Sequence, residues 1–381
     1  MSRRTVLSAG NGAFEAASRR IPQHASRSFS STASNAAVIT QFQPTSSPEL
    51  DTALSTIREK IILPSYLTVQ QRKRIISPKW AKKLQADPIT VEIDGEIFKF
   101  RHMNPFSGEI PNTRRSVIEA IKKFDGTSDD DFKNLRPLIE GVYGAGRQLG
   151  NGFYAKVLRV VGDKGRVAEL MDLARSKKTG FRLDTSEKVN ELLHFIQLNA
   201  LESGWNRAET EQALRWAEHV IEMVQDEAAH APQKRIEGDL PLNRDPQVLL
   251  APLHLAAALI VKGGVKDHKT VTMANKLAST IVKLWPAGRG LRQIHPVSTY
   301  IEDNQRGYLL EANKFVAMAS PLLHGLGLAS QAVTEPTLAA ELKTRYERLE
   351  EEVKSSLSEA AKKGKSSRGQ AVYQKFFGGS A

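Results

Sequence analysis

The repeat-like character of the chain is clearest in residues 153–185, which read FYAKVLRVVGDKGRVAELMDLARSKKTGFRLDT. Apolar residues recur at helical spacing on both sides of Gly165-Arg166, so the pattern predicts two helices, 153–164 and 167–179, folded back on each other. Gly180 stands where a left-handed cap would end the second helix. One helical hairpin leaves apolar surface on both broad faces, so the sequence predicts neighbouring pairs of the same kind.

The rest of the chain supplies such neighbours. Helix pairs are predicted over 186–225 and 245–284, with a polar loop over 228–244 between them. Further single helices are predicted at 48–60, 116–124, 132–146, 303–319, 320–328 and 336–363. Helix pairs that recur every 35 to 60 residues or so indicate an all-α, imperfect helical-hairpin solenoid. An unrelated helical bundle is the alternative.

One short stretch has the pattern of β structure. Residues 89–100 read ITVEIDGEIFKF and alternate around Asp94-Gly95. Asp-Gly tolerates the positive φ angles that a two-residue turn requires, so the sequence predicts one small β-hairpin.

Composition limits the function classes. The chain has 381 residues, 40% of them hydrophobic and 25% charged, which is ordinary for a globular protein. No apolar run approaches the roughly 18 residues of a membrane span, so none is expected. The absence of cysteine excludes disulfides, thiolate nucleophiles and cysteine-based metal sites. A net charge of +12 favours an acidic partner, most commonly nucleic acid.

Part of this charge belongs to the amino terminus. Residues 1–36 are rich in arginine, serine and alanine and contain one acid, Glu15, which is the composition of a mitochondrial transit peptide. A disordered basic tail is the alternative. Removing this segment removes five arginines and one glutamate, which lowers the net charge of +12 by four, to +8. The remaining chain is still basic.

A basic segment follows at residues 63–88, LPSYLTVQQRKRIISPKWAKKLQADP. It has no acid between Leu63 and Ala86, and aromatic residues stand among its cations. Cations neutralise phosphates and aromatic faces stack on splayed bases, so the segment is a candidate RNA contact. A solvated helix whose Trp80 docks on the core is the alternative. The candidate residues are Tyr66, Arg72, Lys73, Arg74, Lys79, Trp80, Lys82 and Lys83.

The carboxyl terminus has a similar composition. Residues 364–381 are predicted to be an extension without a core of its own, ordered on a partner through Tyr373, Phe376 and Phe377. A loosely solvated tail is the alternative. The candidate RNA contacts near it are Lys362, Lys363, Lys365 and Arg368. The predicted divisions of the chain are 1–36, an amino-terminal extension at 37–110, a helical-repeat domain at 111–330, a long amphipathic helix at 331–363, and the tail at 364–381.

No active site is predicted. The glycines between Gly141 and Gly152 follow a helix and lack the Gly-Lys-Ser/Thr of a phosphate-binding loop. His219 and His230 are expected on the surface, and Asp129 to Asp131 are expected to be a solvated helix start and not a cation site. No nucleophile elbow is present. We therefore expect no catalytic residue, metal, cofactor or small-molecule substrate, and no enzyme activity.

Residues 153–185 resemble a pentatricopeptide repeat. Such motifs carry a tyrosine near the first helix start, a Gly-Arg turn, and a glycine then an aspartate that close the unit; Tyr154, Gly165-Arg166, Gly180 and Asp184 stand at those places. Pentatricopeptide arrays read one base per repeat with side chains at fixed positions, here Lys156 and Asp184. The other pairs lack the fixed residues of the motif, so no sequence code is expected.

A second resemblance covers more of the chain. The LPSYL segment at 63–67, the QQRKR run at 70–74, the hairpin and the IPNTR segment at 110–114 resemble fungal mitochondrial small-ribosomal-subunit accessory proteins with pentatricopeptide-like helices. The resemblance implies a structural protein of the mitochondrial matrix, bound to ribosomal RNA and other small-subunit proteins of the mitochondrial ribosome. The alternative is a pentatricopeptide-like factor that acts on the processing, stability or translation of mitochondrial transcripts.

Overall fold

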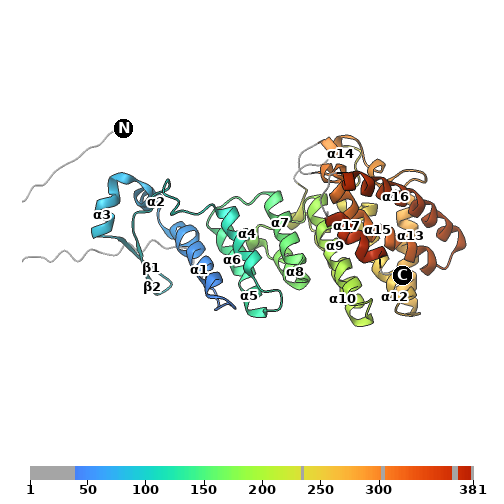
Figure 1. Cartoon of the computed structure of the whole chain (residues 1–381), viewed down its shortest axis with the longest axis horizontal. Coiled ribbons are helices and arrows are strands. Elements are labelled where there is room, and N and C mark those ends of the chain that lie inside the picture. The colour runs from blue at the N-terminus through green and yellow to red at the C-terminus, as the bar shows by residue number, and fades with distance from the viewer. Residues whose placement is uncertain (1–38, 233–235, 302–304, 363–367, 379–381) are drawn as a thin grey trace, which may run out of the picture. The chain divides into compact units, whose positions relative to one another are not determined.

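A computed structural model of the chain describes residues 39–232, 236–301, 305–362 and 368–378 (Figure 1). The predicted transit peptide, Lys363 and Lys365 lie outside these residues. Within them nearly all regular structure is helical, and the one sheet is a two-stranded hairpin. The predicted all-α, solenoid-like fold is confirmed.

The first elements combine three kinds of helical turn. Helix α1 ends where a π-helical turn begins, and a 3-10 turn follows it at the start of the basic segment. The bounds are α1 (Pro48–Ile57), η1 (Arg58–Ile62), η2 (Leu63–Tyr66), α2 (Val69–Ile76), η3 (Pro78–Trp80) and α3 (Ala81–Ala86).

The predicted hairpin is confirmed. Strands β1 (Ile89–Ile93) and β2 (Glu96–Phe100) pair antiparallel, with Ile93 opposite Glu96. The two turn residues have positive φ, 53° at Asp94 and 80° at Gly95, as a two-residue turn between twisted strands demands.

The array of helices follows. Its bounds are α4 (Thr113–Lys123), α5 (Asp129–Lys133), α6 (Leu135–Gly144), α7 (Asn151–Gly162), α8 (Val167–Arg175), η4 (Lys177–Thr179), α9 (Ser186–Glu202), α10 (Arg207–Gln225), α11 (Glu227–His230), η5 (Leu242–Arg244), α12 (Pro246–Val261), α13 (His268–Leu284), η6 (Leu291–Gln293), α14 (Ser298–Ile301), η7 (Gly307–Leu310), α15 (Ala312–Ala332), α16 (Pro336–Lys362) and α17 (Arg368–Phe377).

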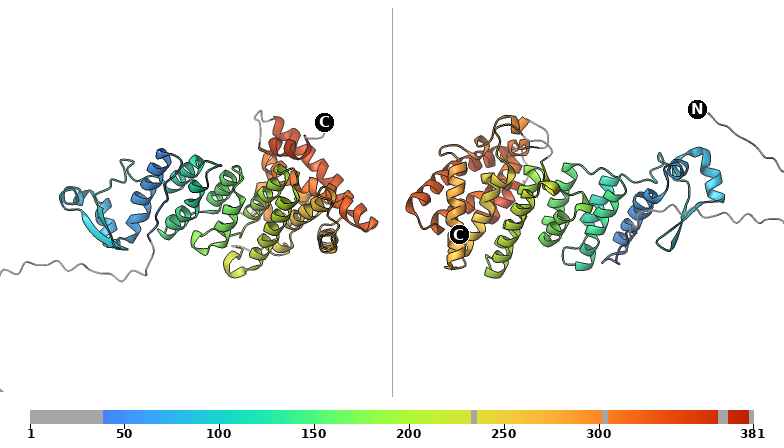
Figure 2. Two further views of the ribbon diagram at one scale, coloured as in Figure 1. Left: turned by 90° about the horizontal axis from the view of Figure 1, so that it is seen from below. Right: turned by 180° about the vertical axis from the view of Figure 1, so that it is seen from behind.

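The predicted pairs form and pack on one another. Helices α7 and α8, α9 and α10, and α12 and α13 contact each other within each pair. The first helix of each pair also contacts the first helix of the next, in the order α4, α7, α9 and α12, and α12 then contacts α15 (Figures 1 and 2). Stacking of this kind buries the apolar surface that a single hairpin would leave in water.

The repeat-like unit turns at the predicted glycines, but its second helix is shorter than predicted, because α8 ends at Arg175 and the 3-10 turn η4 precedes Gly180. Gly165 and Gly180 have φ angles of 74° and 65°, in the left-handed region that residues with a side chain rarely adopt. The hydroxyl of Tyr154 donates to the carbonyl of Thr179 at 2.8 Å, and the Tyr154 ring stacks on Phe181. The tyrosine therefore joins the start of α7 to the end of the unit.

Two hydrophobic cores organise the described residues. The larger runs through the helical array and includes Leu50 and Leu54 of α1, so α1 packs with the array although the sequence groups it with the 37–110 extension. The smaller core lies in residues 63–110, which we call the N-terminal module, and also takes in Ile39. Its buried members are Ile39, Leu63, Leu67, Ile75, Leu84, Ile93, Phe100 and Met103.

The prediction of separate helices at 303–319 and 320–328 is wrong. Helix α15 is continuous from Ala312 to Ala332, with Pro321 inside it. Proline costs an interior helical hydrogen bond, about 3 kcal/mol in an exposed helix. Helix α15 is nearly all buried and packs on α12, α16 and α17, and this packing outweighs the local cost.

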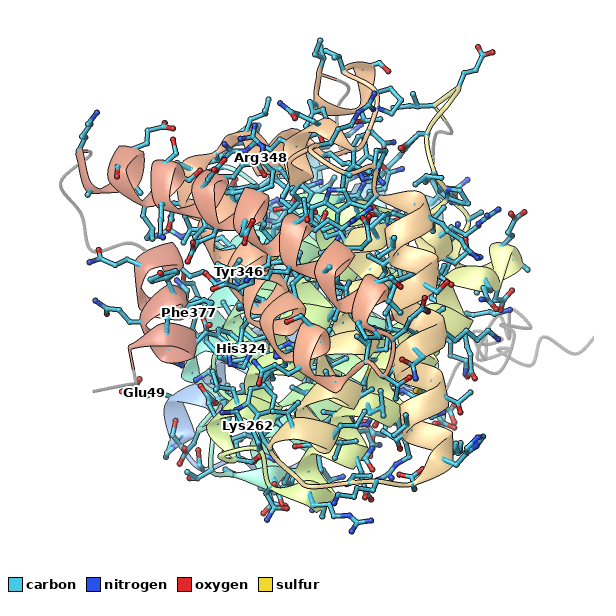
Figure 3. All side chains as sticks on the ribbon, turned by 90° about the vertical axis from the view of Figure 1, so that its right-hand side faces the viewer. Glu49, Lys262, His324, Tyr346, Arg348 and Phe377 are labelled. Atoms are coloured by element: carbon cyan, nitrogen blue, oxygen red, sulfur yellow. The ribbon has the colours of Figure 1, made fainter. Side chains whose placement is uncertain are left out.

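The carboxyl-terminal residues 368–377 are not an extension without a core. They form α17, which packs on α15 and buries Val372 and Phe376. Figure 3 shows Phe377 of α17 beside His324 of α15, and their ring centres lie 5.9 Å apart. The aromatic anchors predicted from sequence are therefore used within the chain itself.

The predicted helix at 132–146 is also interrupted. Ser128 caps the short α5, which contains Asp129 to Asp131, and Asn134 separates it from α6. Asp131 is buried and not solvated, because its carboxylate accepts hydrogen bonds from the backbone N–H groups of Ser46 and Asp125. Burial opposes its ionisation, but these donors hold the pKa of Asp131 below its usual range.

Candidate nucleic-acid interface

The basic segment begins on a capped helix. Thr68 and Gln71 form a capping box at the start of α2: the Gln71 N–H donates to Thr68 Oγ1 at 3.3 Å, and the Thr68 N–H donates to Gln71 Oε1 at 2.9 Å. Ile75 is the buried residue of this helix. Ile75 faces the small core, whereas the side chains of Arg72, Lys73 and Arg74 are exposed to solvent.

Trp80 docks on the core, as one alternative predicts, and it also lies among cations, as an RNA contact would. Its ring is half-buried and packs against the small core of the N-terminal module. The Arg74 guanidinium carbon and Lys83 Nζ also lie 4.9 and 5.4 Å from its ring centre, which are cation–π distances. The tryptophan therefore holds two cations close together at the surface.

The cations of this segment are not compensated. All six are exposed, and none forms an ion pair with a residue that the structure describes. Elsewhere exposed lysines do find partners, as in the pairs Lys122–Glu119 at 3.0 Å and Lys133–Asp130 at 2.7 Å. We call the six the module cations: Arg72, Lys73, Arg74, Lys79, Lys82 and Lys83. Crowded like charges repel one another until a polyanion approaches.

Tyr66 has a different place from the other candidates. Its ring is half-buried and packs against both hydrophobic cores, so it joins the N-terminal module to the array. Burial raises the pKa of its hydroxyl, although Arg58 opposes the shift. This position suits a structural contact better than base stacking.

The two described RNA-contact candidates near the carboxyl terminus lie in different environments. Lys362 is exposed at the end of α16. Arg368 is held inside the fold, because its guanidinium donates to both carboxylate oxygens of Glu191, at 2.8 and 2.7 Å, and lies over Phe195. The two residues are 177 positions apart, and no local pattern in the sequence could have paired them.

The pentatricopeptide code positions do not form a reading surface. Asp184 is buried and pairs with Lys188, whose ammonium also donates to Asn151. Lys156 is exposed. The expectation that no sequence code operates agrees with this burial of Asp184.

A hollow that the sequence reading missed lies between α4 and α7. It has a volume of about 320 Å³, and three cations line it: Arg114, Arg115 and Lys156. Glu119 lies there too, and its pKa is lowered chiefly by its hydrogen bond to Lys122. The Arg-Arg pair just after the Asn112 cap was the available signal in the sequence.

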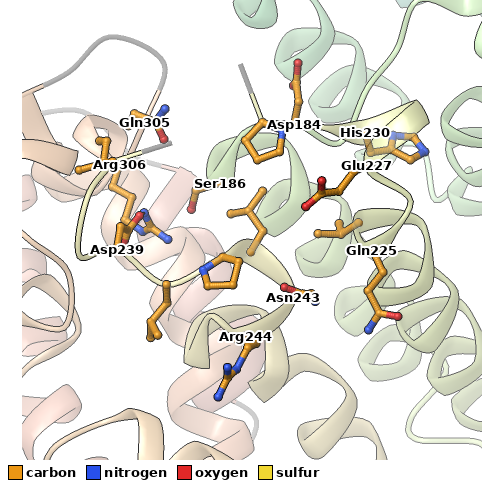
Figure 4. A pocket seen from close by; sticks show the side chains of 16 residues that line it. Asp184, Ser186, Gln225, Glu227, His230, Asp239, Asn243, Arg244, Gln305 and Arg306 are labelled. Atoms are coloured by element: carbon orange, nitrogen blue, oxygen red, sulfur yellow. The ribbon is translucent and has the colours of Figure 1, made fainter. Parts of the chain in front are cut away.

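The charged groups beside a second pocket pair with one another (Figure 4). This pocket holds about 420 Å³ and is bordered by Asp239 and Arg306. The Arg306 guanidinium donates to Asp245 at 2.7 Å, and His295 Nδ1 lies 2.7 Å from Asp239. These buried groups tie the segment before α12 to the segment before α15, so their partners are one another.

The titration of this network follows from its charges. Burial lowers the pKa of His295, but the carboxylates of Asp245 and Asp239 outweigh burial, and the net pKa is raised. Burial likewise opposes ionisation of Asp245, yet Arg306 and His295 hold its pKa far below the usual range. Each charged group in the network therefore stabilises the ionised form of its oppositely charged neighbours.

The two histidines expected on the surface differ. His219 is exposed, as predicted, and lies 3.3 Å from the guanidinium of Arg175. The prediction for His230 is wrong: it is buried, and its Nδ1 accepts the backbone N–H of Leu183 at 3.0 Å.

The described residues offer neither a metal site nor a membrane span. Among them, no cluster of three or more histidine and acidic side chains is arranged to hold a metal ion. No described helix combines the length and apolarity that crossing a membrane would require.

Fold and surface together define the class: an all-α, solenoid-like protein with an uncompensated basic module at its amino-terminal end. The sequence matches the family described as mitochondrial ribosomal protein mS27 over residues 27–375. It is also 33% identical to the small ribosomal subunit protein mS27 of Neurospora crassa, in an alignment that covers 94% of each chain. The chain therefore belongs to the mitochondrial ribosomal protein mS27 family. The resemblance to mitochondrial small-subunit ribosomal proteins is confirmed.

Proposed function

We propose that the chain is a structural component of the small subunit of the mitochondrial ribosome, in the mitochondrial matrix, and that its module cations bind ribosomal RNA there. The RNA contact is inferred from the exposure of six cations that form no ion pair with a described residue. The small core anchors α2 and α3, so these charges have fixed relative positions and do not lie on a flexible extension. Other small-subunit proteins of the mitochondrial ribosome are the remaining partners.

The chemistry of the surface fits phosphate better than base edges. Arginine and lysine contact phosphates without reading sequence, and such contacts position a protein on RNA. Two of the module cations lie at Trp80, which limits how freely they move and lowers the entropy lost on binding. Lys362 is a further single contact at the end of α16.

Family membership favours this role over a free factor that acts on transcripts. A free factor would cross-link to particular mRNAs and to little ribosomal RNA. The ribosomal role predicts that the protein co-sediments with the small subunit in a sucrose gradient through washes of moderate salt. Finding it only in the soluble top fractions would reject the ribosomal role.

A charge-reversal variant tests the RNA contact. The full-length chain with Arg72→Glu, Arg74→Glu and Lys82→Glu should bind small-subunit ribosomal RNA more weakly. The slope of log affinity against log salt should flatten by about two to three, since each lost phosphate contact removes about 0.7 to 0.9. Circular dichroism should show unchanged helicity.

A matched control keeps the same change of net charge. It reverses Lys122, Lys133 and Lys354, which are exposed and ion-paired to acids on their own helices. We expect this control to leave the salt slope close to that of the wild type. If both variants flatten the slope equally, net charge and not the module surface governs binding.

A further inference from the structure

Helix α13 carries a row of lysines and no acid. Its sequence, HKTVTMANKLASTIVKL, has Lys269, Lys276 and Lys283 at intervals of seven residues. Seven residues are close to two helical turns, so the three side chains lie on one face, about 10.5 Å apart in succession. The buried residues Ala274, Ala278 and Ile281 lie on the opposite face, against the array. All three lysines are exposed.

The excess of positive charge extends beyond the helix. Between Pro246 and Ile301 the sequence has seven lysines and arginines and one acid, Asp267. That acid is the cap of α13, where its carboxylate accepts the N–H of Thr270 at 2.8 Å. Lys262 and Lys266 are exposed in the turn just before the helix. Local acids therefore leave the row largely uncompensated.

Other long surface helices of the array mix their charges. Helix α10 contains four glutamates and α16 contains six, and exposed cations on both pair with them, as Arg207 does with Glu211 and Lys354 with Glu350. No lysine of α13 forms an ion pair with a described residue. Glu341 of the neighbouring α16 is bound by Arg345, which also donates to the carbonyls at the end of α13.

We propose that the outward face of α13, made by Lys269, Lys276 and Lys283, binds the phosphate backbone of ribosomal RNA as a second contact, separate from the module cations. The inference rests on the ribosomal role proposed above. The first and third lysines are 14 positions apart, about 21 Å along the helix, which is long enough to follow several phosphates. Lysine acts as a point charge, so this contact gives affinity and position without base recognition.

The composition of the face argues against the other acidic partners. A protein interface is anchored by aromatic residues such as tryptophan and tyrosine and by arginine, whereas the other exposed residues of α13 are His268 and Thr272. A helix that lies on a membrane needs an apolar face free to insert, and the apolar face of α13 is already packed in the core.

The test removes the three charges and keeps the helix. The full-length chain with Lys269→Gln, Lys276→Gln and Lys283→Gln retains good helix formers at each site. Its binding to small-subunit ribosomal RNA is measured over a series of KCl concentrations. We expect the salt slope to fall by about two. The control, Lys122→Gln with Lys133→Gln and Lys354→Gln, should leave the slope unchanged.

The outcomes separate this inference from the proposed function. If the module variant flattens the slope and the α13 variant does not, the second contact is overturned and the ribosomal role stands. If the wild-type chain shows no salt-dependent affinity for the RNA, both are overturned. An equal effect of the control variant would overturn the α13 contact, because position on the surface would then be irrelevant.

A second measurement uses the assembled particle. Acetylation of Lys276 by an activated ester should be slower in intact small subunits than in the free chain, and ribonuclease digestion should restore it. Equal reactivity in both states overturns the inference. Protection that survives the nuclease indicates a protein neighbour and overturns it as well.

Discussion

Arg368 shows how one residue acquires a role that composition does not indicate. In the sequence it stands among lysines and serines, and it is predicted to contact RNA. In the fold its guanidinium pairs with Glu191, whose side chain is only 2% exposed and which also accepts from Arg159 at 3.2 Å. A buried carboxylate needs such partners to stay ionised. The ion pair fixes the start of α17 on α9.

This pair gives a prediction about stability. Replacing Arg368 with alanine leaves the Glu191 carboxylate buried with Arg159 as its one remaining cation. The free energy of unfolding should fall by about 3 kcal/mol, as expected when one partner of a buried pair is removed. Urea unfolding measures the change. Lys354→Ala, which breaks an exposed pair with Glu350, should change stability by less than about 1 kcal/mol. Equal effects would contradict the structural role of Arg368.

The buried His194 and His254 and the half-buried His324 give the fold a pH dependence. His254 and His324 lie 2.8 Å apart between ring nitrogens, and α17 packs over them. Burial, with a smaller effect of Lys262, lowers the pKa of His324 to about 4. Burial, with a smaller effect of His324, holds the pKa of His254 well below its usual value. Burial and Arg368 lower the pKa of His194 to about 3, although Glu191 opposes the shift.

These shifts predict a loss of stability in mild acid. Between pH 6.5 and 4 the unfolded chain binds protons at these histidines while the folded chain does not, so the free energy of unfolding falls as pH falls. His295 acts in the opposite sense, because its pKa is raised and its contribution is lost as pH rises. It is one histidine against four, since burial also lowers the pKa of His230. Denaturant midpoints at pH 7, 6, 5 and 4 measure the trend. His324→Asn should make it shallower; a steeper or equal trend would contradict the assignment.

At the scale of elements, local signals in the sequence located most helices but not all of their ends. The predicted pairs 186–225 and 245–284 match the start of α9 at Ser186, the end of α10 at Gln225 and the end of α13 at Leu284. The Thr185 side chain caps α9, and such caps are local signals. Helix α15 was missed because Pro321 is a local stop signal that tertiary packing overrides. The exposure of the module cations follows from local charge density, whereas the internal use of α17 depends on contacts with distant helices.

Two glycines in α15 provide a matched test of that packing. A Cβ on Gly325 would lie 2.7 Å from Cβ of His254 on α12, so Gly325→Ala should force the helices apart and destabilise by about 1 to 3 kcal/mol. A Cβ on Gly327 would meet the half-buried Tyr346 ring at 3.3 Å, and the gain of about 1 kcal/mol in helix propensity offsets that contact. Thermal unfolding of the two variants should therefore differ clearly. Equal melting temperatures would show that α12 and α15 are not in close contact there.

At the scale of the whole molecule, the described chain has a large core in the array and a small one in the N-terminal module. The small core has eight fully buried hydrophobic residues and carries the module cations on its surface. A core of this size supplies little stability, and contact with the large core through Tyr66 supports it. RNA that neutralises the module cations would remove their mutual repulsion and so stabilise the module on binding.

This division predicts that the module opens without the array. Leu84→Ala removes a buried side chain of the small core and should cost about 2 to 4 kcal/mol there. Hydrogen exchange should then accelerate at residues 63–110 and stay slow in α9 and α12, while affinity for ribosomal RNA falls toward that of the charge-reversal variant. Leu54→Ala, in the large core, should accelerate exchange in α1 and α4 first. If Leu84→Ala accelerates exchange throughout the array, the two cores unfold as one unit, and the module cations depend on the stability of the whole chain.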